Sequence, residues 1–288
     1  MNRPSASSIH VGISTCPNDT YAFHALMNRL VDWRGLDFRF DLLDIQELNG
    51  RLHQGHFDVA KTSFHAAIKL SDRTVVLPSG SALGFGVGPL LLAARTGESP
   101  DDAGRLTLCP GADTTATLLM KLFYPGANRL DQVIFSDIMP RLKAASADFG
   151  VCIHEGRFTW EVEGLHLIED LGARWESETG MPLPLGGLVA RRSLPSETIE
   201  KTQACVRDSI LWANANRDLT LPTMRHHAQE FDDDVLMQHV DLYVNAWTVD
   251  LGDEGTQALQ TLSRRAMRAG VEVNDNIPLQ VFSRQVRG

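Results

Sequence analysis

The chain has 288 residues, of which 43% are hydrophobic and 22% are charged, as in an ordinary soluble globular protein. A chain of this length is too long for one typical hydrophobic core, so we expect two lobes. The formal net charge of −9 argues against a nucleic-acid partner and an anionic membrane surface, and no apolar run approaches the roughly 20 residues of a membrane span.

The N-terminus and the cysteines indicate the cellular compartment. Residues 1–14, MNRPSASSIHVGIS, contain neither the apolar core nor the cleavage site of a secretory signal. The four cysteines are widely spaced and form no CxxC pair, which argues against a zinc site and against thioredoxin-like redox chemistry. We therefore expect a reduced, cytoplasmic protein without a metal site.

The first third of the chain alternates between strands and helices. Short apolar runs predict strands at 9–14, 36–43, 58–62, 74–77 and 89–95. The segments between them predict helices through about residue 30, at 45–54 and at 64–70. A glycine-rich turn at 80–89 does not fit the dinucleotide-binding pattern GxGxxG, so it favours a close backbone approach to a ligand or a hinge.

A second alternating series follows residue 104. It predicts strands at 106–109, 132–135, 150–153 and 188–192, with helices at 114–123 and 137–145. From residue 195 onward the chain reads as helical, at 197–215, 221–229, 233–246 and 255–269. Such alternation predicts an α/β fold with helices on both faces of its sheets.

The helical C-terminal part needs a surface on which to pack. If it packs on the first lobe, the chain crosses between lobes near residues 95 and 190, which gives a larger lobe of 1–95 plus 190–288 and a smaller lobe of 96–189. We expect a two-lobed clamp, each lobe a mostly parallel sheet flanked by helices, with a cleft between the carboxyl edges of the sheets. The alternative is two independent domains in series, with a boundary near 95 or 195.

One histidine stands at the carboxyl end of a predicted strand. Gly150–Ile153 is near-continuously apolar, as in a buried parallel strand, and His154 follows it directly. Ligands of open α/β sheets bind at this edge, and imidazole exchanges protons near neutral pH. The competing interpretation of His154 is a structural histidine bonded to a neighbouring carbonyl.

Two strand-to-helix turns are candidate anion sites. The turn from Ser14 to Asp19 places Asn18 near a helix start, and the turn from Gly111 to Thr117 places Thr114 and Thr115 there. Free N–H groups at a helix N-terminus bind carboxylates, although an ordinary cap or turn explains the same residues. Asn49, inside the second helix, and Ser63, after the third strand, are weak signals individually.

Seven segments together carry a family resemblance: STCPNDTYAFHAL, QELN, AKTSFHA, GSALGFGVGPLL, ADTTATLL, CIHEGRFTW and GMPLPLGGLVARR. In their order and spacing they resemble the 1,4-dihydroxy-6-naphthoate synthases of the futalosine route to menaquinone. The resemblance extends over nearly the whole chain and implies the clamp fold of type II periplasmic binding proteins. One departure is Thr15, which stands where the family pattern has proline.

The resemblance implies a carbon–carbon lyase that needs no cofactor. Its substrate would be cyclic dehypoxanthine futalosine, and its products 1,4-dihydroxy-6-naphthoate and dihydroxyacetone. His154 corresponds to the catalytic base and Asn49 to the polar group that orients it, while Ser63, Thr114 and Thr115 match positions that line the pocket. Ser14, Asn18, Gly186 and Gly187 complete the expected substrate-binding set.

The implied chemistry suits these residues. One histidine in a closed, water-poor cleft can take and return a proton without metal or cofactor, and a helix N-terminus can hold the substrate carboxylate beside an apolar pocket for the rings. Two alternatives stay open: chorismate dehydratase of the same pathway, which lacks the His-Glu-Gly-Arg-Phe-Thr segment, and a solute-binding protein without chemistry. We expect a monomer or a homodimer with a small-molecule ligand.

Overall fold

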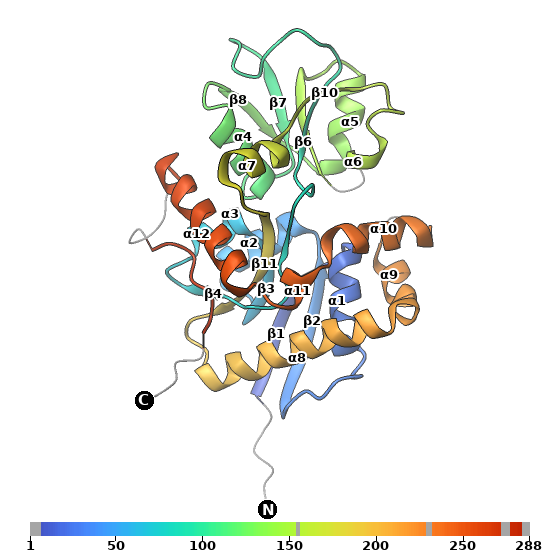
Figure 1. Cartoon of the computed structure of the whole chain (residues 1–288), viewed down its shortest axis with the longest axis vertical. Helices are drawn as coiled ribbons and strands as arrows, with labels where there is room; N and C mark the ends of the chain where they lie inside the picture. Colours follow the sequence, from blue (N-terminus) through green and yellow to red (C-terminus); the bar gives the residue numbers. More distant parts are fainter. Residues whose placement is uncertain (1–6, 154–155, 229–231, 272–276, 284–288) are drawn as a thin grey trace, which may run out of the picture.

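The computed structural model describes residues 7–153, 156–228, 232–271 and 277–283, and its strands form two sheets, one above the other in Figure 1. The first sheet has the order β2-β1-β3-β11-β4, with β5 paired to β11, and the second has the order β10-β6-β9-β7-β8. The first comprises β1 (Ser7–Ser14), β2 (Leu36–Leu43), β3 (Val59–Ser63), β4 (Thr74–Val76), β5 (Ala82–Gly84) and β11 (Leu183–Arg191). The second comprises β6 (Leu90–Ala93), β7 (Leu106–Cys109), β8 (Arg129–Gln132), β9 (Phe149–Cys152) and β10 (His166–Asp170).

Each sheet contains one reversed strand among those described. In the first sheet β1 pairs parallel with β2 and β3, whereas β11 pairs antiparallel with β3, β4 and β5. In the second sheet β7 pairs parallel with β8 and β9, whereas β6 pairs antiparallel with β9 and β10. All other strands of a sheet therefore point the same way, which confirms the mostly parallel sheets expected from the sequence.

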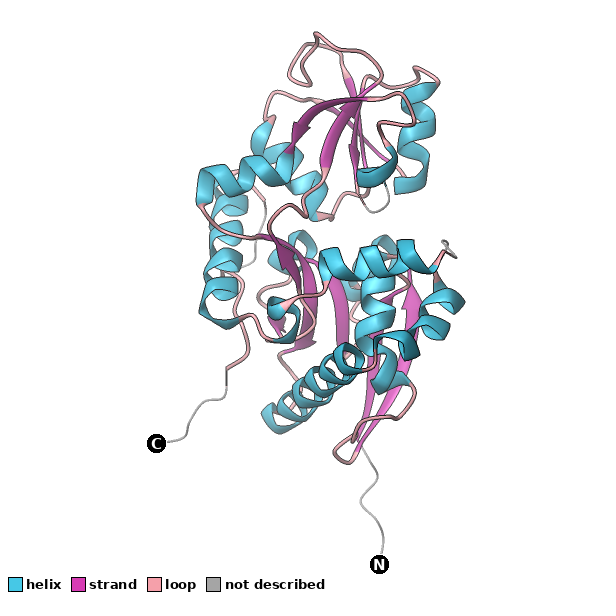
Figure 2. Ribbon diagram, turned by 45° about the vertical axis from the view of Figure 1, so that its right-hand side comes forward, coloured by secondary structure: helices cyan, strands magenta, loops and turns pink. Residues whose placement is uncertain are grey.

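Helices flank both sheets (Figure 2). The first sheet is accompanied by α1 (Pro17–Met27), α2 (Ile45–His53), α3 (Phe64–Lys69), α8 (Ser196–Ala215), the 3₁₀ turn η1 (Arg217–Thr220), α9 (Leu221–His227), α10 (Asp233–Tyr243), α11 (Ala246–Val249) and α12 (Gly252–Arg268). The second is accompanied by α4 (Thr115–Phe123), α5 (Phe135–Lys143), α6 (Gly156–Thr159) and α7 (Leu171–Thr179). We call each sheet with its helices the first and the second lobe.

The chain changes sheets earlier than expected. β6 belongs to the second sheet and β11 to the first, so the two crossings lie at 85–89 and 180–182 instead of near 95 and 190. Both crossing strands are apolar along most of their length, and an apolar run does not reveal which sheet receives it. The strand order gives the points at which the chain changes sheets, and the domain boundaries at 95 and 190 themselves stay a prediction.

Some elements differ from the sequence-based expectation. β2 and β7 have the predicted bounds, but β8 spans 129–132 instead of 132–135, because the last residues of that apolar run begin α5. β10 and α7 were not predicted at all. No residue of β10 is buried, since it is an edge strand that pairs, among the described strands, with β6 alone. Its sequence therefore lacks an apolar pattern.

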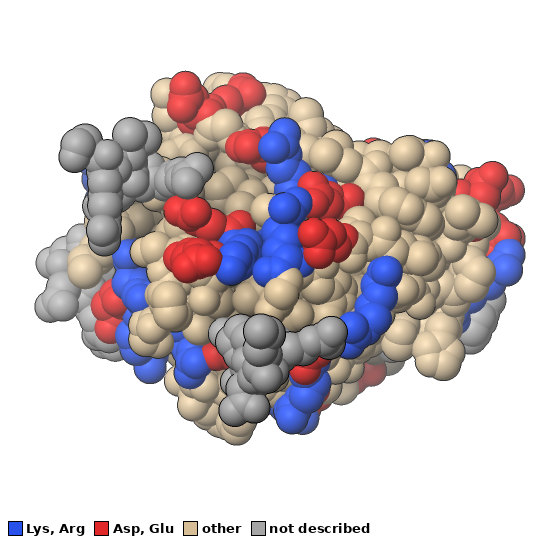
Figure 3. Space-filling model, turned by 90° about the horizontal axis from the view of Figure 1, so that it is seen from below, with Lys and Arg blue, Asp and Glu red and all other residues tan. Residues whose placement is uncertain are grey.

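Charge is mixed on the face seen from below. In Figure 3, basic and acidic side chains interleave without an extended basic patch on that face. Within the part of the chain that the structure describes, no helix is both long and apolar enough to cross a membrane.

Candidate active site

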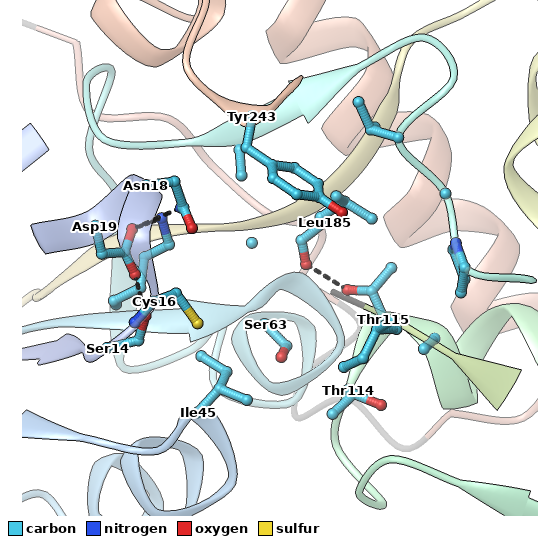
Figure 4. Close-up of a pocket in the computed structure, with 18 of the residues that line it drawn as sticks. Ser14, Cys16, Asn18, Asp19, Ile45, Ser63, Thr114, Thr115, Leu185 and Tyr243 are labelled. Atoms are coloured by element: carbon cyan, nitrogen blue, oxygen red, sulfur yellow. Dashed lines mark hydrogen bonds and ion pairs between the residues drawn. The ribbon is translucent and has the colours of Figure 1, made fainter. Parts of the chain in front are cut away.

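A pocket of about 760 Å³, including its open mouth, lies between elements of both lobes. Its lining combines apolar surface with a few polar groups, as is typical of small-molecule sites. Six of the predicted substrate-binding residues line it, from β1, α1, β3, the start of α4 and β11: Ser14, Asn18, Ser63, Thr114, Thr115 and Gly186. Residues that lie far apart in the sequence thus meet at one site (Figure 4).

One end of the pocket is formed by the turn between β1 and α1. Pro17 occupies the first turn of α1, where its missing N–H is not needed. Ser14 Oγ donates to Asp19 Oδ2 at 2.6 Å, and the Asn18 amide donates to Asp19 Oδ1 at 3.1 Å. Lys61, from β3, donates to Asp19 Oδ1 at 2.5 Å, so this end carries a buried ion pair.

The other end is the N-terminus of α4. The Thr114 hydroxyl caps this helix: it accepts from Thr117 N at 3.2 Å and donates to the Gly111 carbonyl at 2.8 Å. The Thr115 hydroxyl donates to the Leu185 carbonyl at 2.6 Å. The N–H groups of Thr115 and Ala116 have no acceptor among the described residues, and no acidic residue stands in the first turn. This end is therefore suited to an anion.

Asn49 lies behind the pocket wall. It is buried on α2, and its Oδ1 accepts from the Thr62 hydroxyl at 2.7 Å and from Ser63 N at 3.2 Å. Its Nδ2 donates to Ser63 Oγ at 3.3 Å. Thr62 and Ser63 line the pocket, so Asn49 fixes the position of these residues.

His154, the predicted base, lies outside the described residues. Its neighbours in the sequence, Ile153 and Arg157, line the pocket. Arg157 is held by the carbonyls of Gly86 and Gly88, at the first crossing, and its Nη2 lies 3.3 Å from Asp170 Oδ2. The structure thus links the segment after His154 to the crossing between the lobes.

The two predicted glycines of β11 have different surroundings. Gly186 lines the pocket, and a Cβ there would lie 2.7 Å from the Thr62 carbonyl oxygen. Gly187 is not among the residues that line it. A Cβ on Gly187 would lie 2.6 Å from Ser81 Oγ and 2.7 Å from the Phe64 ring, so close packing explains this glycine.

Several residues of the pocket were not singled out from the sequence. Lys61, Arg157 and Tyr243 line it, and Ile45 and Leu185 supply apolar surface between its two polar ends (Figure 4). Lys61 could have been noticed, because a lysine within an otherwise buried strand needs a partner. Tyr243 could not, since only the packing of α10 against α1 and β5 brings it there.

Burial governs the titration of two groups near the site. It raises the pKa of the Cys16 thiol to about 12, with the Asp19 charge adding to the effect, so this pocket residue stays a thiol at neutral pH. Burial also lowers the pKa of His65, two residues after Ser63, to about 4, and the charge of Lys69 lowers it further. Within the described ranges no cluster of three or more His, Cys, Asp or Glu side chains could hold a metal ion.

Comparisons of sequence give a consistent result. A family described as menaquinone biosynthesis matches residues 9–268. A protein named 1,4-dihydroxy-6-naphtoate synthase from Streptomyces coelicolor is 38% identical over 273 residues, which cover 93% of this chain and 95% of that protein. A protein of the same name from Thermus thermophilus is 38% identical over 274 residues, 95% of this chain and 99% of its own.

Solved structures agree with the clamp architecture. A protein of Archaeoglobus fulgidus superimposes with a TM-score of 0.85 at 29% identity, over 92% of this chain and 98% of its own. The periplasmic aliphatic sulphonate binding protein of Escherichia coli superimposes with a TM-score of 0.64 at 11% identity, over 99% and 96%. At that identity only the fold is shared, and the predicted periplasmic-binding-protein fold is confirmed.

Proposed function

The chain belongs to the menaquinone-biosynthesis family, and we propose that within it the protein acts as a 1,4-dihydroxy-6-naphthoate synthase. The reaction is the cleavage of cyclic dehypoxanthine futalosine into 1,4-dihydroxy-6-naphthoate and dihydroxyacetone by a cytoplasmic carbon–carbon lyase. The proposal is supported by the pocket and by the 38% sequence identity, over nearly the full length, to two proteins of that name.

The pocket offers what such a substrate needs. A bicyclic ring fits between Ile45 and Leu185, and its carboxylate fits at the free N–H groups that begin α4. Because the Cys16 thiol is protonated, a nucleophilic thiolate is not available there. His154 is the proposed general base, and Asn49 acts through the pocket residues that it holds, Thr62 and Ser63.

Substrate assays separate this proposal from its rivals. The purified protein is incubated with cyclic dehypoxanthine futalosine, and in parallel with chorismate, while naphthoate fluorescence and loss of chorismate are followed. We expect naphthoate from the first substrate and no change in the second. Consumption of chorismate alone would identify a chorismate dehydratase, and binding without turnover of either compound would identify a solute-binding protein.

A single variant tests the proposed base. His154→Asn should reduce turnover by roughly 10²–10⁴, the contribution of a general base, while the affinity for naphthoate stays unchanged. Far-ultraviolet circular dichroism and thermal unfolding check that the variant is folded. Turnover near the wild-type rate would remove His154 from the mechanism and leave the lyase activity to another group.

A further inference from the structure

Lys61 is a buried lysine in the central part of the first sheet. All five residues of β3 are buried, and the side chains of Lys61 and Asp19 are only 7% and 4% exposed. Lysine is almost never buried without a partner. Moving two charges out of water costs several kcal/mol per ion, so a buried ion pair stabilises a fold little or not at all. The pair therefore calls for an explanation other than stability.

Lys61 and Asp19 line the pocket, and the Lys61 ammonium group can still donate a hydrogen bond. An ammonium group has three N–H bonds, and Lys61 Nζ uses two of them, toward Asp19 Oδ1 and toward the Gly80 carbonyl at 3.1 Å. No other described residue accepts from Nζ. The Asn18 amide, which lines the same end, spends one of its two N–H bonds on Asp19. This end can thus donate hydrogen bonds to a ligand.

The charge balance selects the kind of ligand. Asp19 neutralises Lys61, so this end does not call for a second anion, whereas the N-terminus of α4 at the opposite end does (Figure 4). Uncharged oxygens such as hydroxyl and carbonyl groups fit donors of this kind. A ligand with a carboxylate at one end and several neutral oxygens at the other would satisfy both ends of the pocket.

We propose that Lys61, held in place by Asp19, donates hydrogen bonds to the oxygens of the sugar-derived part of the substrate, the part that leaves as the three-carbon fragment. The inference rests on the proposed function and adds an orientation to it. The substrate carboxylate points to α4, the ring system lies beside Ile45 and Leu185, and the sugar-derived part points to Asn18 and Lys61.

A double variant tests this orientation. Asp19→Asn combined with Lys61→Met removes both charges at similar volume and leaves no unpaired buried charge. We expect KM for the substrate to rise about ten- to a hundredfold, the effect of losing a hydrogen bond to a charged donor. The inhibition constant of 1,4-dihydroxy-6-naphthoate, which lacks the sugar-derived part, should stay within a factor of two.

The control removes a different ion pair from the same strand region. Asp58 precedes β3 and pairs with Arg191 of β11, and neither residue lines the pocket. Asp58→Asn combined with Arg191→Gln should leave both constants unchanged. Wild-type turnover is measured first, because its absence would contradict the proposed function itself and not the orientation.

Two results would overturn the inference. An unchanged KM in the folded Asp19/Lys61 double variant would show that the pair does not contact the substrate. A parallel rise of KM and of the naphthoate inhibition constant would show that the pair supports the whole pocket. If the double variant does not fold, Asn18→Ala takes its place: a selective rise in KM supports the inference, and no rise or a parallel rise contradicts it.

Discussion

Asn49 shows how a side chain outside the pocket governs the residues inside it. Its amide makes three hydrogen bonds, to the Thr62 hydroxyl and to the backbone and hydroxyl of Ser63. Asn49 itself does not line the pocket. Within the described residues it therefore acts as a positioning residue for β3, at the point where that strand ends and α3 begins.

Removal of this amide should affect both stability and turnover. Asn49→Ala leaves buried polar groups of Thr62 and Ser63 without their partner, and we expect about 2 kcal/mol less unfolding free energy and roughly tenfold slower turnover. Urea unfolding and steady-state kinetics measure the two effects. Ser63→Ala is the matched control, because it keeps the bond from Asn49 to Thr62: it should slow turnover with little loss of stability. Full turnover of Asn49→Ala would contradict the positioning role.

The pocket residues that could be predicted from the sequence lie at the ends of predicted strands and at the start of a predicted helix. Ser14 and Ser63 are the last residues of β1 and β3, Thr114 precedes α4, and each lines the pocket. Lys61 and Asp19 were not chosen: a lysine in an apolar strand indicates that it needs a partner, but no local pattern identifies Asp19, 42 positions away, as that partner. The ion pair is recognised only in the folded structure, where β1 pairs with β3 and brings the start of α1 beside Lys61.

At the scale of elements, the N-termini of α1 and α4 meet the pocket with different electrostatics. Asp19 stands in the first turn of α1 and already occupies the favourable position for a negative charge. The first turn of α4 contains no acidic residue, and its N–H groups at Thr115 and Ala116 have no acceptor among the described residues. A substrate carboxylate is therefore better accommodated at α4.

Substitutions at the cap of α4 test this anchor. Thr114→Val removes the capping hydroxyl, which should lower stability by about 1 kcal/mol and loosen the first turn. Because the proposed anchor would hold substrate and product alike, KM and the naphthoate inhibition constant should rise together, about tenfold. Thr114→Ser keeps the hydroxyl and should restore both constants. If neither constant changes in Thr114→Val, the anchor lies elsewhere, with the turn before α1 as the next candidate.

Strands and helices could be predicted from the sequence where their residues show an apolar pattern. β2, β7 and α8 stand close to their expected bounds, whereas β10 and α7 were missed. α7 does carry signals: Asp170 caps it by accepting from two backbone N–H groups, and Gly180 ends it with a left-handed φ of 67°. Without an apolar strand before them, these caps did not suffice to identify the helix.

At the scale of the whole molecule, one set of contacts between the lobes lies at the start of α4. His65 Nδ1 lies 3.1 Å from the Thr114 carbonyl, and the Thr115 hydroxyl bonds to the Leu185 carbonyl. Lys69 forms an ion pair with Asp113 in the same region. Because the pKa of His65 is about 4, its ring stays neutral near pH 7 and donates through Nδ1 to the carbonyl.

We expect ligand binding to close the lobes about the crossings at 85–89 and 180–182. In the proposed orientation, naphthoate contacts Ile45 of the first lobe and the start of α4 in the second, so its binding energy would favour the closed arrangement. Small-angle scattering at pH 7.5 should give a smaller radius of gyration with saturating naphthoate than without it. Thr114→Val at a naphthoate concentration that saturates only the wild type serves as the control and should show a weaker decrease. An unchanged radius with ligand bound, as verified by calorimetry, would mean that the pocket between the lobes is already formed before the substrate arrives.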